Sequence, residues 1–147
     1  MQVFFTIGRI LLVAIFILSG AQKLLDVGAT AQMIQTKIPT DMLTDLAAPL
    51  VEMTGMRVPQ LLAILVGVIE LVSGVLIAFN VGTRGAALLL VLFTIAATYF
   101  YHDFWTMTGP DREQNMIHAL KNLSIIGGLL VLFALGSRRV LVPARID

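Results

Sequence analysis

Four long apolar stretches alternate with shorter polar ones along the chain. They predict membrane-spanning helices over residues 3–22, 59–79, 84–102 and 114–135. A helix needs about 20 mostly apolar residues to cross a bilayer, and continuous apolarity over that length is typical of a helix in lipid. Within a single segment, only a helix satisfies its own backbone hydrogen bonds there. The pattern therefore predicts an all-α integral membrane four-helix bundle.

The polar connections indicate how these helices are joined. Residues 80–84, NVGTR, form a short turn that makes the second and third spans antiparallel neighbours, and residues 103–115 form a polar turn with a Gly-Pro break. The connection between the first two spans is longer. Its interfacial segment, 27–57, contains two short amphipathic stretches separated by Pro39. Neither can cross a membrane, so we expect short helices that lie at the membrane interface.

We expect the spans, the interfacial segment and a basic C-terminal tail, 136–147, to form one membrane domain over residues 1–147. The first span has one feature of a cleaved signal peptide, because Ser19 and Ala21 have the small-x-small spacing of a cleavage site. No Lys or Arg precedes its apolar run, however, and Arg9 lies inside it. We therefore expect the segment to be retained.

Composition agrees with a membrane protein and excludes several kinds of chemistry. The chain is 58% hydrophobic and 13% charged, whereas a soluble domain carries roughly a quarter charged residues. Its net charge of +1 gives no basic surface for nucleic acid. The absence of Cys excludes disulfides, thiolate chemistry and covalent haem attachment. No recognisable motif encodes a cofactor, and no HxxH or ExxH spacing occurs, so we predict no metal site.

Basic residues near the ends of the spans give the expected orientation. Arg84, Arg138, Arg139 and Arg145 lie on the side of both termini, whereas the basic residues on the other side are mixed with acidic ones. Because Arg138 and Arg139 closely follow the last span, we expect both termini in the cytoplasm and the protein in a bacterial inner membrane. The long connection would then face the periplasm.

Three ionisable residues, Arg9, Glu70 and Lys121, lie within the apolar spans. A charge that faces lipid is costly, so each should face the bundle interior and find a partner. With a rise of about 1.5 Å per residue, Arg9 and Glu70 lie at similar depths from the expected cytoplasmic face. We therefore predict a structural Arg9–Glu70 ion pair, with Lys121 as the weaker alternative partner of Glu70.

Polar residues also gather on the other side of the membrane. Helical spacing places several side chains of the fourth span on one arc, and the first and third spans contribute further polar residues at the same level. We predict a polar pocket lined by Lys23, His102, Gln114, His118, Lys121 and Asn122. Two alternatives stay open at this point. The fourth-span arc also fits an interhelical hydrogen-bond network without a ligand, and His102 with Trp105 also suits an anchor at the membrane interface.

Four stretches of the sequence resemble the DoxX family of small bacterial membrane proteins. In chain order they are GRILLVAIFILSGAQKLLD, ELVSGVLIAFNVGTRGAALLL, TYFYHDFW and ALKNLSIIGGLLVL. The family pattern maps onto Arg9, Ser19, Gly20, Lys23, Glu70, Gly74, His102, Phe104, Trp105, Lys121, Asn122, Gly127 and Gly128. Many relatives lack the stretch from about Thr40 to Arg57, and we consider that this stretch caps the pocket or contacts a partner.

The resemblance implies a quinone-linked function. Name-giving members look like membrane subunits of thiosulfate:quinone oxidoreductase, so quinone is the cofactor to expect. The catalytic candidates are then His102, His118 and Lys121, and the substrate-binding candidates are Lys23, Gln114, Asn122 and Trp105. Lys121 would stabilise negative charge on a quinone oxygen, and a His would deliver protons. Electrons would come from a partner or from a substrate bound beside the quinone.

The resemblance also implies an alternative without catalysis. Other members of the family resemble assembly factors or chaperones, so the chain would be a membrane scaffold or a partner-binding subunit. Its partners would be the lipid bilayer and another protein subunit, or further copies of itself. A small-solute transporter ranks last, because the sequence contains no inverted repeat or broken helix.

Overall fold

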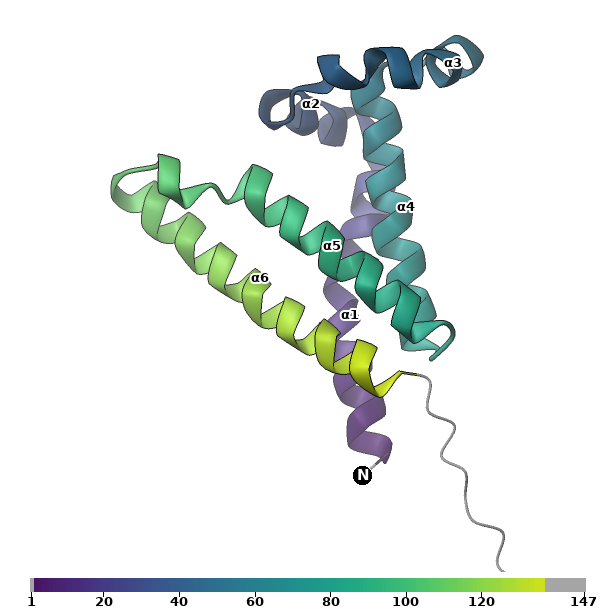
Figure 1. The fold of residues 1–147 in the computed structure, drawn as a ribbon, viewed down its shortest axis with the longest axis vertical. Helices are drawn as coiled ribbons and strands as arrows, with labels where there is room; N and C mark the ends of the chain where they lie inside the picture. The colour runs from purple at the N-terminus through teal and green to yellow at the C-terminus, as the bar shows by residue number, and fades with distance from the viewer. Residues whose placement is uncertain (1, 137–147) are drawn as a thin grey trace, which may run out of the picture.

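The computed structural model describes residues 2–136, and within that range the chain is helical, with no strand. The four long helices are α1 (Gln2–Leu25), α4 (Val58–Ala78), α5 (Thr83–Tyr101) and α6 (Gly109–Leu135) (Figure 1). Each of them is long and apolar enough to cross a membrane. The predicted all-α fold with four spanning helices is therefore confirmed. Except for Gly136, the predicted basic tail lies outside the described residues.

Short helices fill the connection between α1 and α4, as predicted. They are α2 (Val27–Lys37), η1 (Thr40–Leu43) and α3 (Thr44–Thr54), and all three lie at one end of the bundle (Figure 1). Asp26 begins α2 as its N-cap, because its carboxylate accepts a hydrogen bond of 2.9 Å from the Ala29 backbone N–H. Ala31 and Ile34 of α2 pack against Ala63 of α4, which holds α2 on the bundle.

The polar turn before α6 is shorter than predicted. A short helix, η2 (Phe104–Thr106), follows α5, and α6 begins at Gly109 rather than at residue 114. Pro110 lies in the first turn of α6, where a missing backbone N–H costs no intrahelical hydrogen bond. Asp111 is also in this turn, where its negative charge is favoured by the helix dipole. The Gly-Pro pair therefore starts the helix instead of delaying it.

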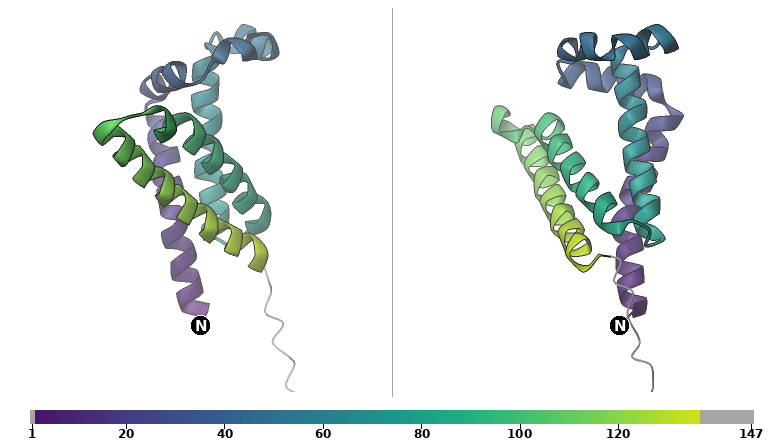
Figure 2. Two further views of the ribbon diagram at one scale, coloured as in Figure 1. Left: turned by 60° about the vertical axis from the view of Figure 1, so that its left-hand side comes forward. Right: turned by 45° about the vertical axis from the view of Figure 1, so that its right-hand side comes forward.

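The four long helices form two antiparallel hairpins, α1–α4 and α5–α6. A tight turn with left-handed backbone at Asn80 (φ 60°) and Gly82 (φ 56°) joins α4 to α5. The hairpins meet near this turn and diverge toward the end that carries α2 and α3 (Figures 1 and 2). Where they meet, one apolar core contains residues of all four long helices, among them Val13, Ile77, Leu90 and Leu129.

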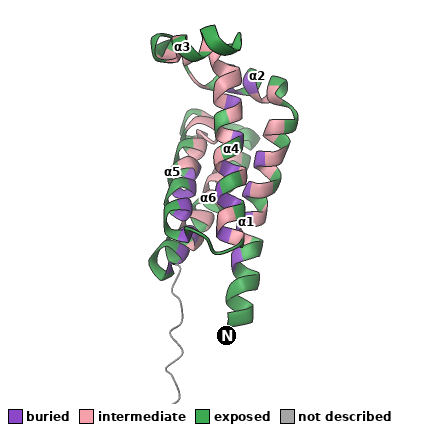
Figure 3. Cartoon of the chain, turned by 90° about the vertical axis from the view of Figure 1, so that its right-hand side faces the viewer, coloured by how far each residue is buried: buried purple, intermediate pink, exposed green. Residues whose placement is uncertain are grey.

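The outside of the bundle is apolar. Phe4, Leu11 and Leu18 of α1 are 78%, 69% and 65% exposed, as expected of side chains that face lipid. Buried residues lie mainly on the sides of the helices that face one another (Figure 3). The first turns of α1, residues 2–8, are exposed throughout and extend beyond the end of α4.

Candidate functional site

Glu70, on α4, is the buried carboxylate of the site, and only 3% of the residue is exposed. The Lys23 ammonium on α1 lies 2.6 Å from Glu70 Oε2. Ser19 Oγ donates a hydrogen bond of 3.2 Å to Glu70 Oε1, and Lys23 Nζ donates to Ser19 Oγ. Ser19 and Lys23 are one helical turn apart and so share a face of α1. The three side chains form one charge-paired cluster, as a buried carboxylate in a membrane requires.

Glycines allow the close helix contact that builds this cluster. A Cβ on Gly20 of α1 would lie 2.6 Å from the Leu71 backbone nitrogen and 2.7 Å from the Gly67 carbonyl oxygen. The backbones of α1 and α4 therefore touch at this level, as small residues permit between membrane helices. Because Ser19 and Lys23 flank Gly20 on α1, the contact brings both of them to Glu70.

The predicted Arg9–Glu70 ion pair is wrong, because Glu70 pairs with Lys23 instead. Arg9 is buried at the far end of α4, where its Nη2 donates to the Ala78 carbonyl oxygen at 3.2 Å. Eight residues separate Ala78 from Glu70, which is about 12 Å along the helix. Because the first turns of α1 extend beyond the end of α4, Arg9 lies at the level of Ala78 rather than at that of Glu70.

A cavity of about 760 Å³ lies between the hairpins where they diverge. Ser19, Lys23 and Glu70 line one wall, from α1 and α4. His102, which ends α5, and Asn122, on α6, line the opposite wall. Most of the other lining side chains are apolar, and α2 also contributes to the lining. The cavity is therefore an apolar space with polar groups on two facing walls.

His102 belongs to a small polar group at the wide end of the α5–α6 hairpin. Its ring stacks on His118 with the centroids 5.0 Å apart, and its Nδ1 lies 3.1 Å from Asn115 Oδ1. Asn115 Nδ2 donates to the Asp111 carbonyl oxygen, which leaves Asn115 Oδ1 as the acceptor. His102 Nδ1 therefore carries the proton of this hydrogen bond, and the Nε2 of a neutral His102 ring is free to accept one.

The other predicted site residues are distributed over different parts of the hairpin. Asn122 lines the cavity, and its Nδ2 donates to Thr98 Oγ1 at 2.9 Å. Gln114 and Lys121 are exposed and do not line the cavity. Trp105 lines a separate apolar groove of about 390 Å³ between α5 and α6. His118 is half-buried behind His102 and does not reach the cavity either.

Two residues of the site, Ser19 and Asn115, were not predicted as site residues, although Ser19 belongs to the family pattern. Ser19 lies one turn before Lys23, and this spacing is the signal that would have identified it as a bridge between the ammonium and a carboxylate. Asn115 shares a face of α6 with His118 and Asn122 at helical spacing, and this spacing would have added it to the predicted polar arc beside Gln114.

Comparison with known proteins places the chain among membrane proteins. The DoxX family model matches residues 4–103. The chain is also 32% identical over 139 residues to the protein described as "Inner membrane protein YphA" of Escherichia coli (strain K12), an alignment that covers 95% of this chain and 87% of that protein. No solved structure matches the chain significantly. With its four spanning helices, the chain is a multi-pass membrane protein that belongs to the DoxX family.

Proposed function

We propose that this protein is a quinone-binding membrane subunit of an oxidoreductase system and that the cavity between its hairpins is the quinone site. The observation that carries the proposal is the pair of polar walls, with Lys23 and Glu70 on one side and His102 and Asn122 on the other. Small-molecule sites are typically apolar cavities with a few convergent polar groups, and the volume of about 760 Å³ lies in their usual range. A quinone needs both features, because polar groups can bind the carbonyl oxygens of its ring and an apolar lining can hold its isoprenoid tail.

Lys23 takes the role that the sequence suggested for Lys121. An ammonium has three N–H donors, and Glu70 and Ser19 accept from two of them. The third is available to donate to a quinone oxygen, where a cation stabilises developing negative charge. Asn122 likewise keeps one Nδ2–H after its hydrogen bond to Thr98. Each of the two walls therefore offers one donor that a quinone carbonyl oxygen could accept from.

The stacked histidines would move protons. A bound quinone supplies two-electron, two-proton redox chemistry, and its electrons would come from a reduced partner protein or a reduced substrate. His118 lies behind His102, near the polar start of α6, and His102 lines the cavity. Histidine exchanges protons near neutral pH, so this pair would connect the water-facing end of the hairpin to the cavity.

Quinone retention tests the proposal. The protein is purified from membranes in mild detergent and extracted with organic solvent, and quinone is quantified per mole of protein by chromatography and mass spectrometry. We expect close to one quinone per chain in the unmodified protein and most of it lost in both Lys23→Met and Asn122→Leu.

Lys121→Met is the matched control, because Lys121 is a membrane Lys outside the cavity, and it should retain quinone. Thermal unfolding in the same detergent checks that each variant is folded. An unmodified protein without quinone, or folded Lys23→Met and Asn122→Leu variants that retain all of it, would overturn the proposal.

A second candidate function, as a non-catalytic scaffold or assembly factor, is favoured by the apolar surface of η1 and α3. Met42, Leu46 and Met53 are 82%, 81% and 83% exposed there, at the end of the bundle. In this case, deletion of residues 40–56 should abolish recovery of a partner in a gentle detergent pull-down, while Lys23→Met should leave it unchanged. Loss with Lys23→Met but not with the deletion would refute this alternative.

A further inference from the structure

Lys121 is an exposed cation near the middle of the spanning helix α6. The two ion pairs among residues 2–136 join Lys23 to Glu70 and Lys37 to Asp103, so neither involves Lys121. Its neighbours Leu120 and Leu123 are 56% and 62% exposed, as is usual for side chains in contact with lipid. A charge at such a place is costly unless an opposite charge meets it, so Lys121 needs a partner from outside this part of the chain.

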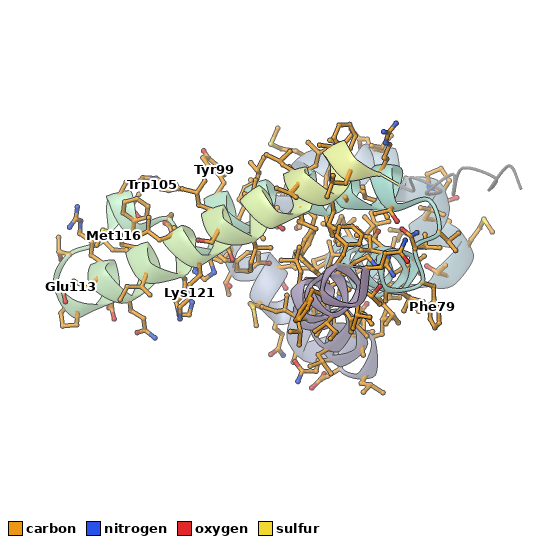
Figure 4. All side chains as sticks on the ribbon, turned by 90° about the horizontal axis from the view of Figure 1, so that it is seen from below. Phe79, Tyr99, Trp105, Glu113, Met116 and Lys121 are labelled. Carbon is orange, nitrogen blue, oxygen red and sulfur yellow. The ribbon has the colours of Figure 1, made fainter. Side chains whose placement is uncertain are left out.

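The side chain of Lys121 is directed toward an opening in the bundle. Gly128 follows Lys121 by two helical turns on the same face, and it packs against Leu12 of α1, where an added Cβ would lie 3.0 Å from Leu12 Cδ2. The two hairpins diverge toward the start of α6 (Figure 2), and Lys121 lies nearer that start than Gly128 does. Tyr99 and Trp105 lie on the opposite side of α6 from Lys121 (Figure 4). Lys121 therefore faces the opening between α1 and α6.

The face of α6 around Lys121 has the spacing of a helix-packing surface. Gln114, Ile117, Lys121 and Ser124 are all exposed, at intervals of three, four and three residues, and we call these four residues the α6 face. That interval pattern places side chains along one seam of a left-handed helix pair. Three of the four are polar, and polar side chains favour contact with a neighbouring membrane helix over contact with lipid.

A second copy of this chain does not supply the missing negative charge. Copies in one membrane share the same orientation, so a two-fold axis along the membrane normal brings Lys121 to the depth of the other Lys121. Glu70 is 3% exposed and already paired with Lys23. Asp111 and Glu113 lie at the start of α6, and eight residues, about 12 Å along the helix, separate Glu113 from Lys121. Asp103 is paired with Lys37, and Asp26, Asp41, Asp45 and Glu52 lie in the connection between α1 and α4. No carboxylate among residues 2–136 of a second copy is therefore placed to meet Lys121, which favours a different protein as its source.

We propose that the α6 face is a docking surface for a transmembrane helix of another membrane protein, and that this helix carries an Asp or Glu at the depth of Lys121. The helix would pack along α6 at the edge of the opening toward α1, beside the cavity rather than inside it. Its carboxylate would accept a charge-assisted hydrogen bond from Lys121 Nζ in surroundings that screen charge poorly. This inference rests on neither the cavity nor a bound quinone, and it concerns a different surface from that of η1 and α3.

Site-specific photo-cross-linking in native membranes tests the docking surface. A benzophenone amino acid replaces Ser124, on the α6 face, or Leu123, on the other side of α6 next to Trp105. We expect position 124 to cross-link to a transmembrane segment with an Asp or Glu, and position 123 to yield mainly lipid adducts. Lys121→Met should lower the yield from position 124 about tenfold, the scale of one polar contact between membrane helices. The matched substitution Leu120→Met should not change it.

A charge exchange then separates a specific contact from incidental capture. Lys121→Glu alone should abolish the adduct, and Lys121→Glu together with Lys in place of the partner's acidic residue should restore it. Four results would overturn the proposal: no adduct from position 124, an adduct with a second copy of this chain, an adduct with phospholipid alone, or a yield that Lys121→Met leaves unchanged. An adduct with phospholipid alone would assign Lys121 to the lipid head groups, which a Lys side chain approaches by extending along the helix. An unchanged yield would show that Lys121 does not hold the partner helix.

Discussion

Gly20→Ala should destabilise the protein more than any other Gly→Ala change in α1. The new Cβ would lie 2.6 Å from the Leu71 backbone nitrogen, whereas ordinary Cβ contacts begin at 3.4 Å, so α1 and α4 must separate by roughly 0.8 Å. Rotation of a side chain cannot relieve this contact, because both close atoms belong to backbone. Overpacking of this kind costs about 1–3 kcal/mol. The same separation would lengthen the 3.2 Å Ser19–Glu70 hydrogen bond beyond a useful distance.

Reversible unfolding in mixed detergent micelles, followed by helical circular dichroism, measures this cost. Gly8→Ala is the control on the same helix, since no atom lies within 4 Å of its added Cβ, and it should be neutral or slightly stabilising because Ala favours helix. Gly67→Ala should fall between the two, because the closest atoms to its added Cβ are Cδ2 and Cγ of the flexible Leu24 side chain, both at 2.9 Å. If Gly20→Ala proved as stable as Gly8→Ala, the direct backbone contact between α1 and α4 would be refuted.

Two further predictions concern the charged cluster and the orientation of the chain. Lys23→Met should cost about 3–5 kcal/mol because it leaves the buried Glu70 carboxylate without its cation, and adding Glu70→Gln should recover much of that loss in the same unfolding assay. Strictly additive losses would show that the two side chains do not interact. Because the chain has no Cys, single-Cys variants report its orientation: a membrane-impermeant maleimide should label Glu52→Cys from the periplasm and Arg84→Cys only after lysis. The reverse labelling would place both termini outside.

The spanning helices were predictable because a bilayer imposes a length and a continuous apolarity that few other structures share. The antiparallel arrangement of α4 and α5 followed from the shortness of residues 80–84. The start of α6 was misplaced by five residues, because Pro110 was interpreted as a break although its ring is compatible with a first helical turn. The error came from the two roles of Pro and not from the hydrophobic pattern.

The partner of Glu70, which is Lys23 and not Arg9, shows what a sequence leaves undetermined in a membrane bundle. Residue spacing gives depth along one helix, but the offset between two helices depends on where their surfaces fit. Here the Gly20 contact with α4 determines that offset and brings Lys23 to Glu70, while Arg9 reaches the end of α4. The polar arc on α6 was real in its spacing, yet only Asn122 of its predicted members lines the cavity, because the α5–α6 hairpin diverges from α1.

The two hairpins contrast in how they enclose charge, and this contrast follows from packing. Glycine contact between α1 and α4 encloses Glu70 with Lys23, whereas Lys121 on the diverging α6 stays exposed. At the wide end, an ion pair links α2 to the α5–α6 hairpin. Lys37 Nζ lies 3.5 Å from Asp103 Oδ1, and both side chains are accessible to solvent. Exposed pairs of this kind contribute little, so the apolar core near the α4–α5 turn must mainly determine how far the hairpins open. Binding of a ligand in the cavity, or of a helix at Lys121, therefore needs to displace only the wide end of the α5–α6 hairpin, which is weakly attached to α2.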